Sequence, residues 1–356
     1  MTAQGAPSTF RGEAEATLAF AIASGVGALV GLIVFWGRPS PLWSGWSVGA
    51  VAAIAAGALA LIAAYVANWR SRHAPTQQWR LSIPSWKFIL DATVVAVVHA
   101  ALVMIVTVAL FVVLQRAFTG LLADAFLAAV SIGLAAGLSA YWTSISCQTI
   151  TTQRMSTLLV AYMLMSVFAS MLTVSDPLWW EYHFSQLGSF GDGSASLFNI
   201  TLIVAGGMVV AFSVYIGRDL QLAVDQGLLT RKKTPRTVAT LFVIMGIMLA
   251  GVGAVPVPVS EPLHVAFASG MFAVFIGMLI AARRLFDGLP YTVHIITWIF
   301  LAAIALTVVL FWPIGYFNLT ALELVAFGLI FGWIVVFIRL ESAARESATV
   351  APATND

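Results

Sequence analysis

Long apolar runs constrain this chain more than any other feature of its sequence. A helix that crosses the roughly 30 Å hydrocarbon core of a membrane needs about 20 apolar residues, and about ten such runs follow one another here. Lipid offers no hydrogen bonds to the backbone, and long continuous runs favour helices over the short alternating runs of a barrel. The sequence therefore predicts an all-α integral membrane protein. The expected spans are residues 17–36, 46–67, 88–114, 121–142, 155–174, 196–216, 237–257, 263–282, 291–312 and 320–340.

Composition excludes a soluble alternative. Only 9% of the residues are charged, against about 25% in ordinary soluble domains, so the chain cannot cover a core of this size with polar surface. The first run, residues 17–36, is longer than the roughly 7–15 residues of a signal-peptide core. We therefore expect it to be the first membrane span.

Positive charges support ten spans and give them a direction. With ten helices and a cytoplasmic N-terminus, 15 of the 17 Lys and Arg residues fall inside, and only Arg38 and Arg116 fall outside. The positive-inside rule predicts this bias, so we expect both termini in the cytoplasm of a bacterial plasma membrane. Trp36, Trp142 and Trp312 lie near expected helix ends, where tryptophan anchors a membrane protein at the interface.

The spans suggest three parts, namely a four-helix membrane part (1–154), a six-helix membrane core (155–340) and a short cytoplasmic tail (341–356). The cytoplasmic loop 217–236 holds a basic cluster. These cations either bind anionic lipid or only set the orientation of the chain. The cluster consists of Arg231, Lys232, Lys233 and Arg236.

Pairs of glycines four residues apart indicate close helix packing, because they let two backbones approach each other. Such pairs begin at Gly27, Gly133 and Gly328. Each pair forms either a helix contact within the chain, which we favour, or a dimer interface with a membrane-protein partner.

Several kinds of chemistry lack their signatures. Cys147 is the only cysteine, so neither a disulfide within the chain nor a CxxC metal site can form. The sequence has no G-x-S-x-G, H-E-x-x-H or Walker A pattern. We expect no metal, no cofactor and no nucleic-acid partner, and we favour a non-enzymatic function.

Ionisable residues inside membrane spans are costly and often functional. Asp91 forms either a local ion pair with Lys87 or part of a functional site. His99 is either a neutral histidine bonded to a neighbouring helix or a proton relay, and we favour the first alternative. Glu323 lies near the outer end of its span, where its side chain could simply reach the headgroup region.

The most suggestive polar residues fall on the expected outer face. The loop 174–195 has no Lys or Arg, and a second polar group begins the span near 263. If the helices from 155 to 282 pack together, these groups could share one outer vestibule, with carboxylates raising the pKa of a neighbouring histidine. The alternatives are a solvated loop, a binding site and a catalytic site. The candidate residues are Asp176, His183, Ser185, Asn199, Glu261 and His264.

A family resemblance enters at the same residues. Roughly residues 155–310 resemble a bacterial membrane-protein family of unknown function, which is distantly similar to the DRAM/Frag/Sfk membrane proteins. The resemblance implies a multi-helix membrane domain with an outer-face polar site and supplies no reaction. It lies in HFSQLG (183–188), LFN (197–199), Gly206-Gly207, GAVP (253–256), His264 and Ala268.

Three functions remain open. The leading hypothesis is recognition or passage of a lipid or small polar molecule at the outer vestibule. The second is an intramembrane enzyme that acts on a lipid or envelope substrate, with His183 or His264 as the base. The third is a structural subunit of a membrane complex.

Overall fold

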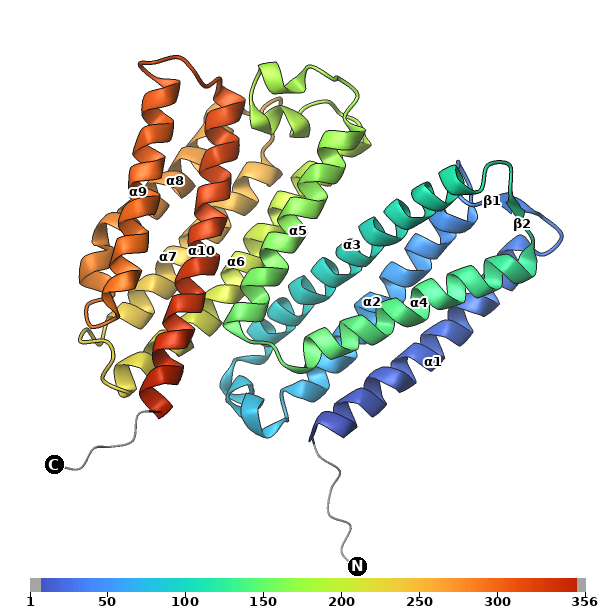
Figure 1. Cartoon of the computed structure of the whole chain (residues 1–356), viewed down its shortest axis with the longest axis horizontal. Coiled ribbons are helices and arrows are strands. Elements are labelled where there is room, and N and C mark those ends of the chain that lie inside the picture. Colours follow the sequence, from blue (N-terminus) through green and yellow to red (C-terminus); the bar gives the residue numbers. More distant parts are fainter. Residues whose placement is uncertain (1–7, 351–356) are drawn as a thin grey trace, which may run out of the picture. The chain divides into compact units, whose positions relative to one another are not determined.

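A computed structural model describes residues 8–350 of the chain. It shows an all-α membrane protein. Within this part of the chain, ten helices are long and apolar enough to cross a membrane (Figure 1). The predicted fold class is therefore confirmed. The helices are α1 (Ser8–Phe35), α2 (Val48–Ser71), α3 (Ser85–Ala117), α4 (Ala125–Gln148), α5 (Thr152–Thr173), α6 (Gly193–Asp225), α7 (Thr234–Ala254), α8 (Glu261–Leu285), α9 (Tyr291–Phe311) and α10 (Leu319–Val350).

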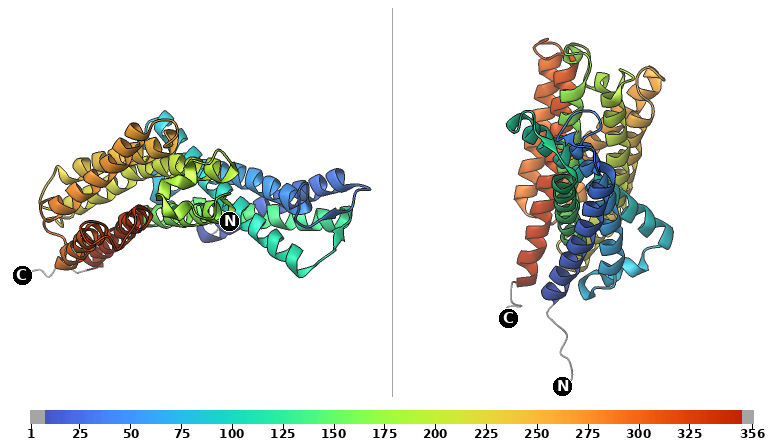
Figure 2. Two further views of the ribbon diagram at one scale, coloured as in Figure 1. Left: turned by 90° about the horizontal axis from the view of Figure 1, so that it is seen from above. Right: turned by 90° about the vertical axis from the view of Figure 1, so that its right-hand side faces the viewer.

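The chain divides into two compact units, Met1–Ile150 and Thr151–Asp356. The first contains α1–α4 and the second contains α5–α10, and within each unit the helices run alongside one another (Figure 2). Short elements connect the helices. They are the paired strands β1 (Ser40–Pro41) and β2 (Leu122–Ala123) and the 3₁₀ helices η1 (Pro75–Ser82), η2 (Trp179–Glu181) and η3 (Phe184–Gly188).

Several helices begin with a polar N-cap residue, which lies just before the apolar run of the helix. The side chain of Asp124 accepts the N–H of Leu127 at 2.8 Å, and the side chain of Asp192 accepts the N–H of Ala195 at 2.9 Å. Thr151 caps α5 in the same way. These side chains satisfy backbone donors that the first turn of a helix leaves unpaired.

Glycines set the packing of the first unit, in which α4 contacts both α1 and α2. A methyl group on Gly27 would lie 2.8 Å from the carbonyl oxygen of Ile132 and 3.1 Å from the Cα of Gly133. The glycine pairs that begin at Gly27 and Gly133 therefore face each other within one chain. The structure places no atom within 4 Å of such a methyl group on Gly328.

The second unit is built around α6, which packs against α5 and α7. Of the apolar segment of α6, 56% is buried, against 22% for α8 and for α9. Gly206 and Gly246 allow a close backbone approach between α6 and α7, since a methyl group on Gly246 would lie 2.6 Å from the carbonyl oxygen of Gly206. Large apolar side chains such as Leu172, which is 86% exposed, cover the outside of this unit, as a lipid environment requires.

Candidate functional site

The loop between α5 and α6 is held against the start of α10. A carboxylate oxygen (Oε2) of Glu323 accepts the N–H of Phe184 at 2.6 Å, and the Nδ2 of Asn318 donates to the carbonyl oxygen of Trp180 at 2.9 Å. The ring of Phe184 is buried and lies 5.4 Å from the ring of Phe198 on α6. Glu323, expected near the headgroups, instead fixes η3 in place.

Asn199 links η3 to α6 and α7. Its Nδ2 donates to the carbonyl oxygen of Gly188 at 2.9 Å, and its own backbone oxygen lies against Gly253. A side chain at Gly188 would collide with the Asn199 amide. Asn199 therefore positions the loop, and the glycines allow the close approach.

His264 carries a buried polar atom that has no hydrogen-bond partner among the described residues. It lies in the first turn of α8 and is 5% exposed. Its Nδ1 lies 2.9 Å from the carbonyl oxygen of Val255. Because a carbonyl only accepts, Nδ1 carries the hydrogen, and in a neutral ring Nε2 is then an acceptor. This Nε2 is buried and has no hydrogen-bond partner among the described residues, which is uncommon for a buried polar atom.

His264 and Glu261 both lie within electrostatic range of His183. Burial lowers the pKa of His183, the nearby His264 lowers it further, and Glu261 raises it less than these two effects lower it. The sequence predicted that carboxylates would raise the pKa of a histidine here. This prediction is wrong for His183, because desolvation outweighs the attraction of Glu261. We call His183, Glu261 and His264 the histidine cluster.

The other two predicted residues have local roles in the structure. The carboxylate of Asp176 accepts the N–H of Leu178 at 2.8 Å and closes a turn. The N–H of Ser185 is held by Glu323, whose carboxylate binds it together with the N–H of Phe184. The backbone of η3 is thus fixed on both residues that follow His183.

Asp192 likewise serves the backbone. The hydroxyl of Ser194 and the N–H of Ala195 bind its carboxylate and lower its pKa to about 2. It stays ionised at every physiological pH and caps α6. In the part of the chain that the structure describes, no three His, Cys, Asp or Glu side chains come together in a way that could hold a metal ion.

The two ends of the second unit differ in charge. The loop 174–192 contains carboxylates, and none of the loops 174–192, 255–260 and 312–318 contains Lys or Arg. Of the exposed basic cluster, Arg231, Lys232 and Lys233 lie in the connection between α6 and α7, and Arg236 lies in the first turn of α7. Because consecutive loops alternate between the ends of a helical bundle, the basic cluster and the histidine cluster lie at opposite ends.

A buried ion network at that opposite end was not predicted from the sequence. Nε of Arg345 lies 2.6 Å from a carboxylate oxygen of Glu341, and its Nη2 lies 3.3 Å from the carboxylate of Asp219. The hydroxyl of Thr152 also donates to Asp219, and Glu341 is fully buried. The only sequence signal is the spacing of Glu341 and Arg345, which are four apart and so share a helix face.

In the first unit, both ring nitrogens of His99 have a hydrogen-bond partner. Its Nδ1 lies 2.8 Å from the carbonyl oxygen of Val95, and its Nε2 lies 2.9 Å from the hydroxyl of Ser146 on α4. This geometry fits a neutral histidine bonded to a neighbouring helix, the alternative that we favoured.

In the described part of the chain, ten apolar helices and many exposed large apolar side chains define a multi-pass α-helical membrane protein. The chain matches the family model described as "Protein of unknown function (DUF998)" over residues 157–340. It belongs to this family. The match covers η2, η3, the histidine cluster and almost all of the six helices of the second unit. Comparisons with curated proteins and with solved structures found no match.

Proposed function

We propose that the second unit binds a lipid or small polar molecule at the histidine cluster. One observation carries this proposal, namely the buried Nε2 of His264, which has no hydrogen-bond partner among the described residues. A buried polar atom that lacks a partner costs about 1–3 kcal/mol. A ligand that donates a hydrogen bond to Nε2 would remove this cost.

The charge of the cluster narrows the chemistry of the ligand. A neutral His264 that donates from Nδ1 to Val255 offers only an acceptor at Nε2. The lowered pKa of His183 favours a neutral ring at that residue, and Glu261 adds a carboxylate. These groups fit a ligand with N–H or O–H donors, such as the amine or hydroxyl of a lipid headgroup, better than they fit a bare anion.

The surroundings favour a lipid as the source of this group. The cluster lies where three helices end, next to apolar side chains that are exposed, such as Leu263 and Val265. The positive-inside bias supports an outer-face position for this end in a bacterial plasma membrane. The ligand would thus enter from the outer leaflet or the outer solution.

Two substitutions of His264 test the proposal. His264→Asn keeps a donor for the carbonyl of Val255 but removes the Nε2 position, whereas His264→Gln retains a polar atom near that position. We expect purified His264→Asn protein to lose bound phosphatidylethanolamine in native mass spectrometry, and His264→Gln to retain part of it. His294→Asn on α9 is the matched control and should behave as the wild type.

Phosphatidylcholine provides a second control, because its trimethylammonium group has no N–H donor. We expect it to bind more weakly than phosphatidylethanolamine in the wild type and equally in His264→Asn. Unchanged binding of phosphatidylethanolamine by His264→Asn would show that Nε2 does not recognise this lipid. A polar solute that co-purifies with the wild type and not with His264→Asn would support the solute form of the proposal.

A further inference from the structure

A groove in the first unit runs along the helices α1 and α2, with α4 at its base. Its volume is about 200 Å³. Leu59, Ile62, Ala63 and Val66 line it from α2, and their spacing of three and four residues places them on one face of the helix. Small residues of α4 such as Ala140 leave room between the helices.

The length of the groove matches one leaflet. It extends on α2 from Leu59 to Arg70, and eleven steps of 1.5 Å give about 16 Å. One leaflet accounts for half of the roughly 30 Å hydrocarbon core, or about 15 Å. An acyl chain could therefore lie along the whole groove with its headgroup near Arg70.

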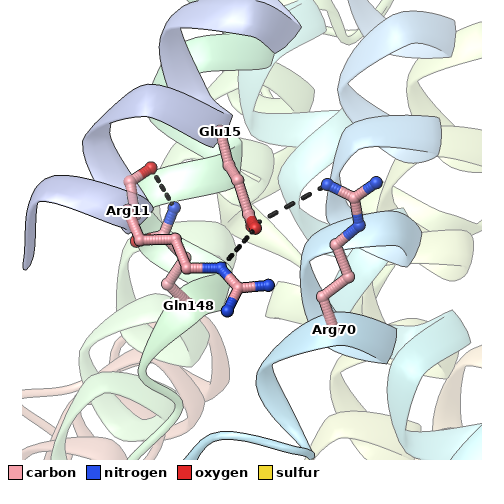
Figure 3. Close-up of polar contacts among 5 residues, drawn as sticks. Arg11, Glu15, Arg70 and Gln148 are labelled. Atoms are coloured by element: carbon pink, nitrogen blue, oxygen red, sulfur yellow. Dashed lines mark hydrogen bonds and ion pairs between the residues drawn. The ribbon is translucent and has the colours of Figure 1, made fainter. Parts of the chain in front are cut away.

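Charged groups close one end of the groove (Figure 3). The carboxylate of Glu15 lies 3.4 Å from Nε of Arg11 and 3.9 Å from Nη1 of Arg70. The side chains of Arg11 and Arg70 are 81% and 58% exposed. Gln148 ties this end of α1 to α4, because its Nε2 donates to the carbonyl oxygen of Gly12 at 2.7 Å.

We propose that the groove holds one acyl chain of an anionic phospholipid, whose phosphate meets Arg70 and Arg11. Two guanidinium groups face one carboxylate in this contact, so Arg11, Arg70 and Glu15 together carry a net positive charge. Arginine suits phosphate because its planar donors match the phosphate oxygens. This site is separate from the histidine cluster and does not depend on a ligand there.

Glu15 competes with the phosphate for the two arginines. Its separation from Arg70, 3.9 Å, is at the long end for an ion pair, and a phosphate at the membrane surface can replace it. Removing the carboxylate should therefore strengthen binding of the lipid, and removing Arg70 should weaken it. A phosphate site therefore predicts opposite effects of the two substitutions on lipid binding. If Glu15 and Arg70 form only a structural ion pair, either substitution would break that pair and neither would strengthen lipid binding.

A matched pair of substitutions tests the groove in the full-length protein. Ala63 lines the groove, and Ala58 lies on the same helix, exposed and outside it. We expect Ala63→Phe to abolish cross-linking of phosphatidylglycerol with a diazirine on its acyl chain to α1 and α2. Ala58→Phe should leave this cross-linking unchanged. Cross-linking that survives in Ala63→Phe, or is lost equally in both variants, would overturn the proposal.

Charge substitutions test the headgroup in native mass spectrometry. We expect Arg70→Gln to lower retention of phosphatidylglycerol about fivefold, the factor that corresponds to about 1 kcal/mol for one cation near an anionic surface. Retention of phosphatidylcholine should not change, and Arg116→Gln at the far end of α3 should have no effect. Glu15→Gln should raise retention of phosphatidylglycerol. Lower retention in Glu15→Gln, or an equal loss of both lipids in Arg70→Gln, would contradict the proposal.

Discussion

Replacing glycine by alanine should have opposite effects on stability at Gly246, which is packed against Gly206, and at Gly328, which is not packed. Gly246→Ala would place a methyl carbon 2.6 Å from the carbonyl oxygen of Gly206, whereas carbon and oxygen atoms normally stay about 3.3 Å or more apart. The nearest obstacle is backbone, so α6 and α7 would have to separate by about 0.7 Å. Overpacking of this kind costs about 1–3 kcal/mol.

Gly328→Ala provides the matched control on α10, because no atom lies within 4 Å of the added methyl group. There, only the gain in helix propensity remains, about 0.5–1 kcal/mol. Per kcal/mol, the melting temperature of a unit of this size shifts by about 2–4 °C. We therefore expect Gly246→Ala to melt about 2–12 °C lower and Gly328→Ala about 1–4 °C higher in a fluorescence assay of detergent-solubilised protein. Equal shifts for the two variants would refute the packing argument.

Three further predictions concern the loop and the orientation of the chain. Glu323→Ala should release η3, so that the amide of Phe184 exchanges its hydrogen at least about tenfold faster, since a hydrogen bond to a charged group contributes about 1.5–3 kcal/mol. His183 binds protons less readily when folded, because its pKa is lowered, so its contribution to stability is complete above the unfolded pKa of about 6.5 and falls as the pH drops below that value. His183→Gln should remove this part of the pH dependence of the melting temperature. A membrane-impermeant thiol reagent outside intact cells should label Ser189→Cys and should label Lys232→Cys only after permeabilisation.

Each of these predictions has its own control. Glu181→Ala removes an exposed carboxylate from the same loop and should leave the rate of hydrogen exchange at the amide of Phe184 unchanged. Glu261→Gln should lower the pKa of His183 further in a histidine NMR titration, because it removes the one influence that raises it. Cys147 is fully buried, so the protein without an added cysteine should not be labelled and serves as the background control. Labelling of Lys232→Cys from outside intact cells would show that the predicted orientation of the chain is wrong.

Hydropathy was sufficient to predict all ten helices but not their ends. The lipid-spanning part of a helix must be apolar, and this requirement is visible in the sequence. Beyond the lipid it no longer applies, and α6 and α10 continue to Asp225 and Val350. As a result, Asp219 and Arg345 were assigned to loops or tails, and their ion network was missed.

The candidate site could be predicted only in part, because its contacts join distant segments. The polar residues near 183 and 264 stood out against their apolar surroundings. The pairing of Glu323 with Phe184 spans 139 residues, and no local pattern indicates it. The effect of burial on His183 was also missed, because a sequence shows which charges are present but not how much water surrounds them.

An experimental density map of the protein in a lipid bilayer would test the central claim most directly. Our account predicts that a polar atom of a bound molecule lies within about 3.2 Å of Nε2 of His264, at hydrogen-bond distance, while Nδ1 stays bonded to the carbonyl of Val255. A protein side chain or a single water bonded to Nε2, or hydrocarbon alone beside it, would contradict the claim that the histidine cluster is a binding site.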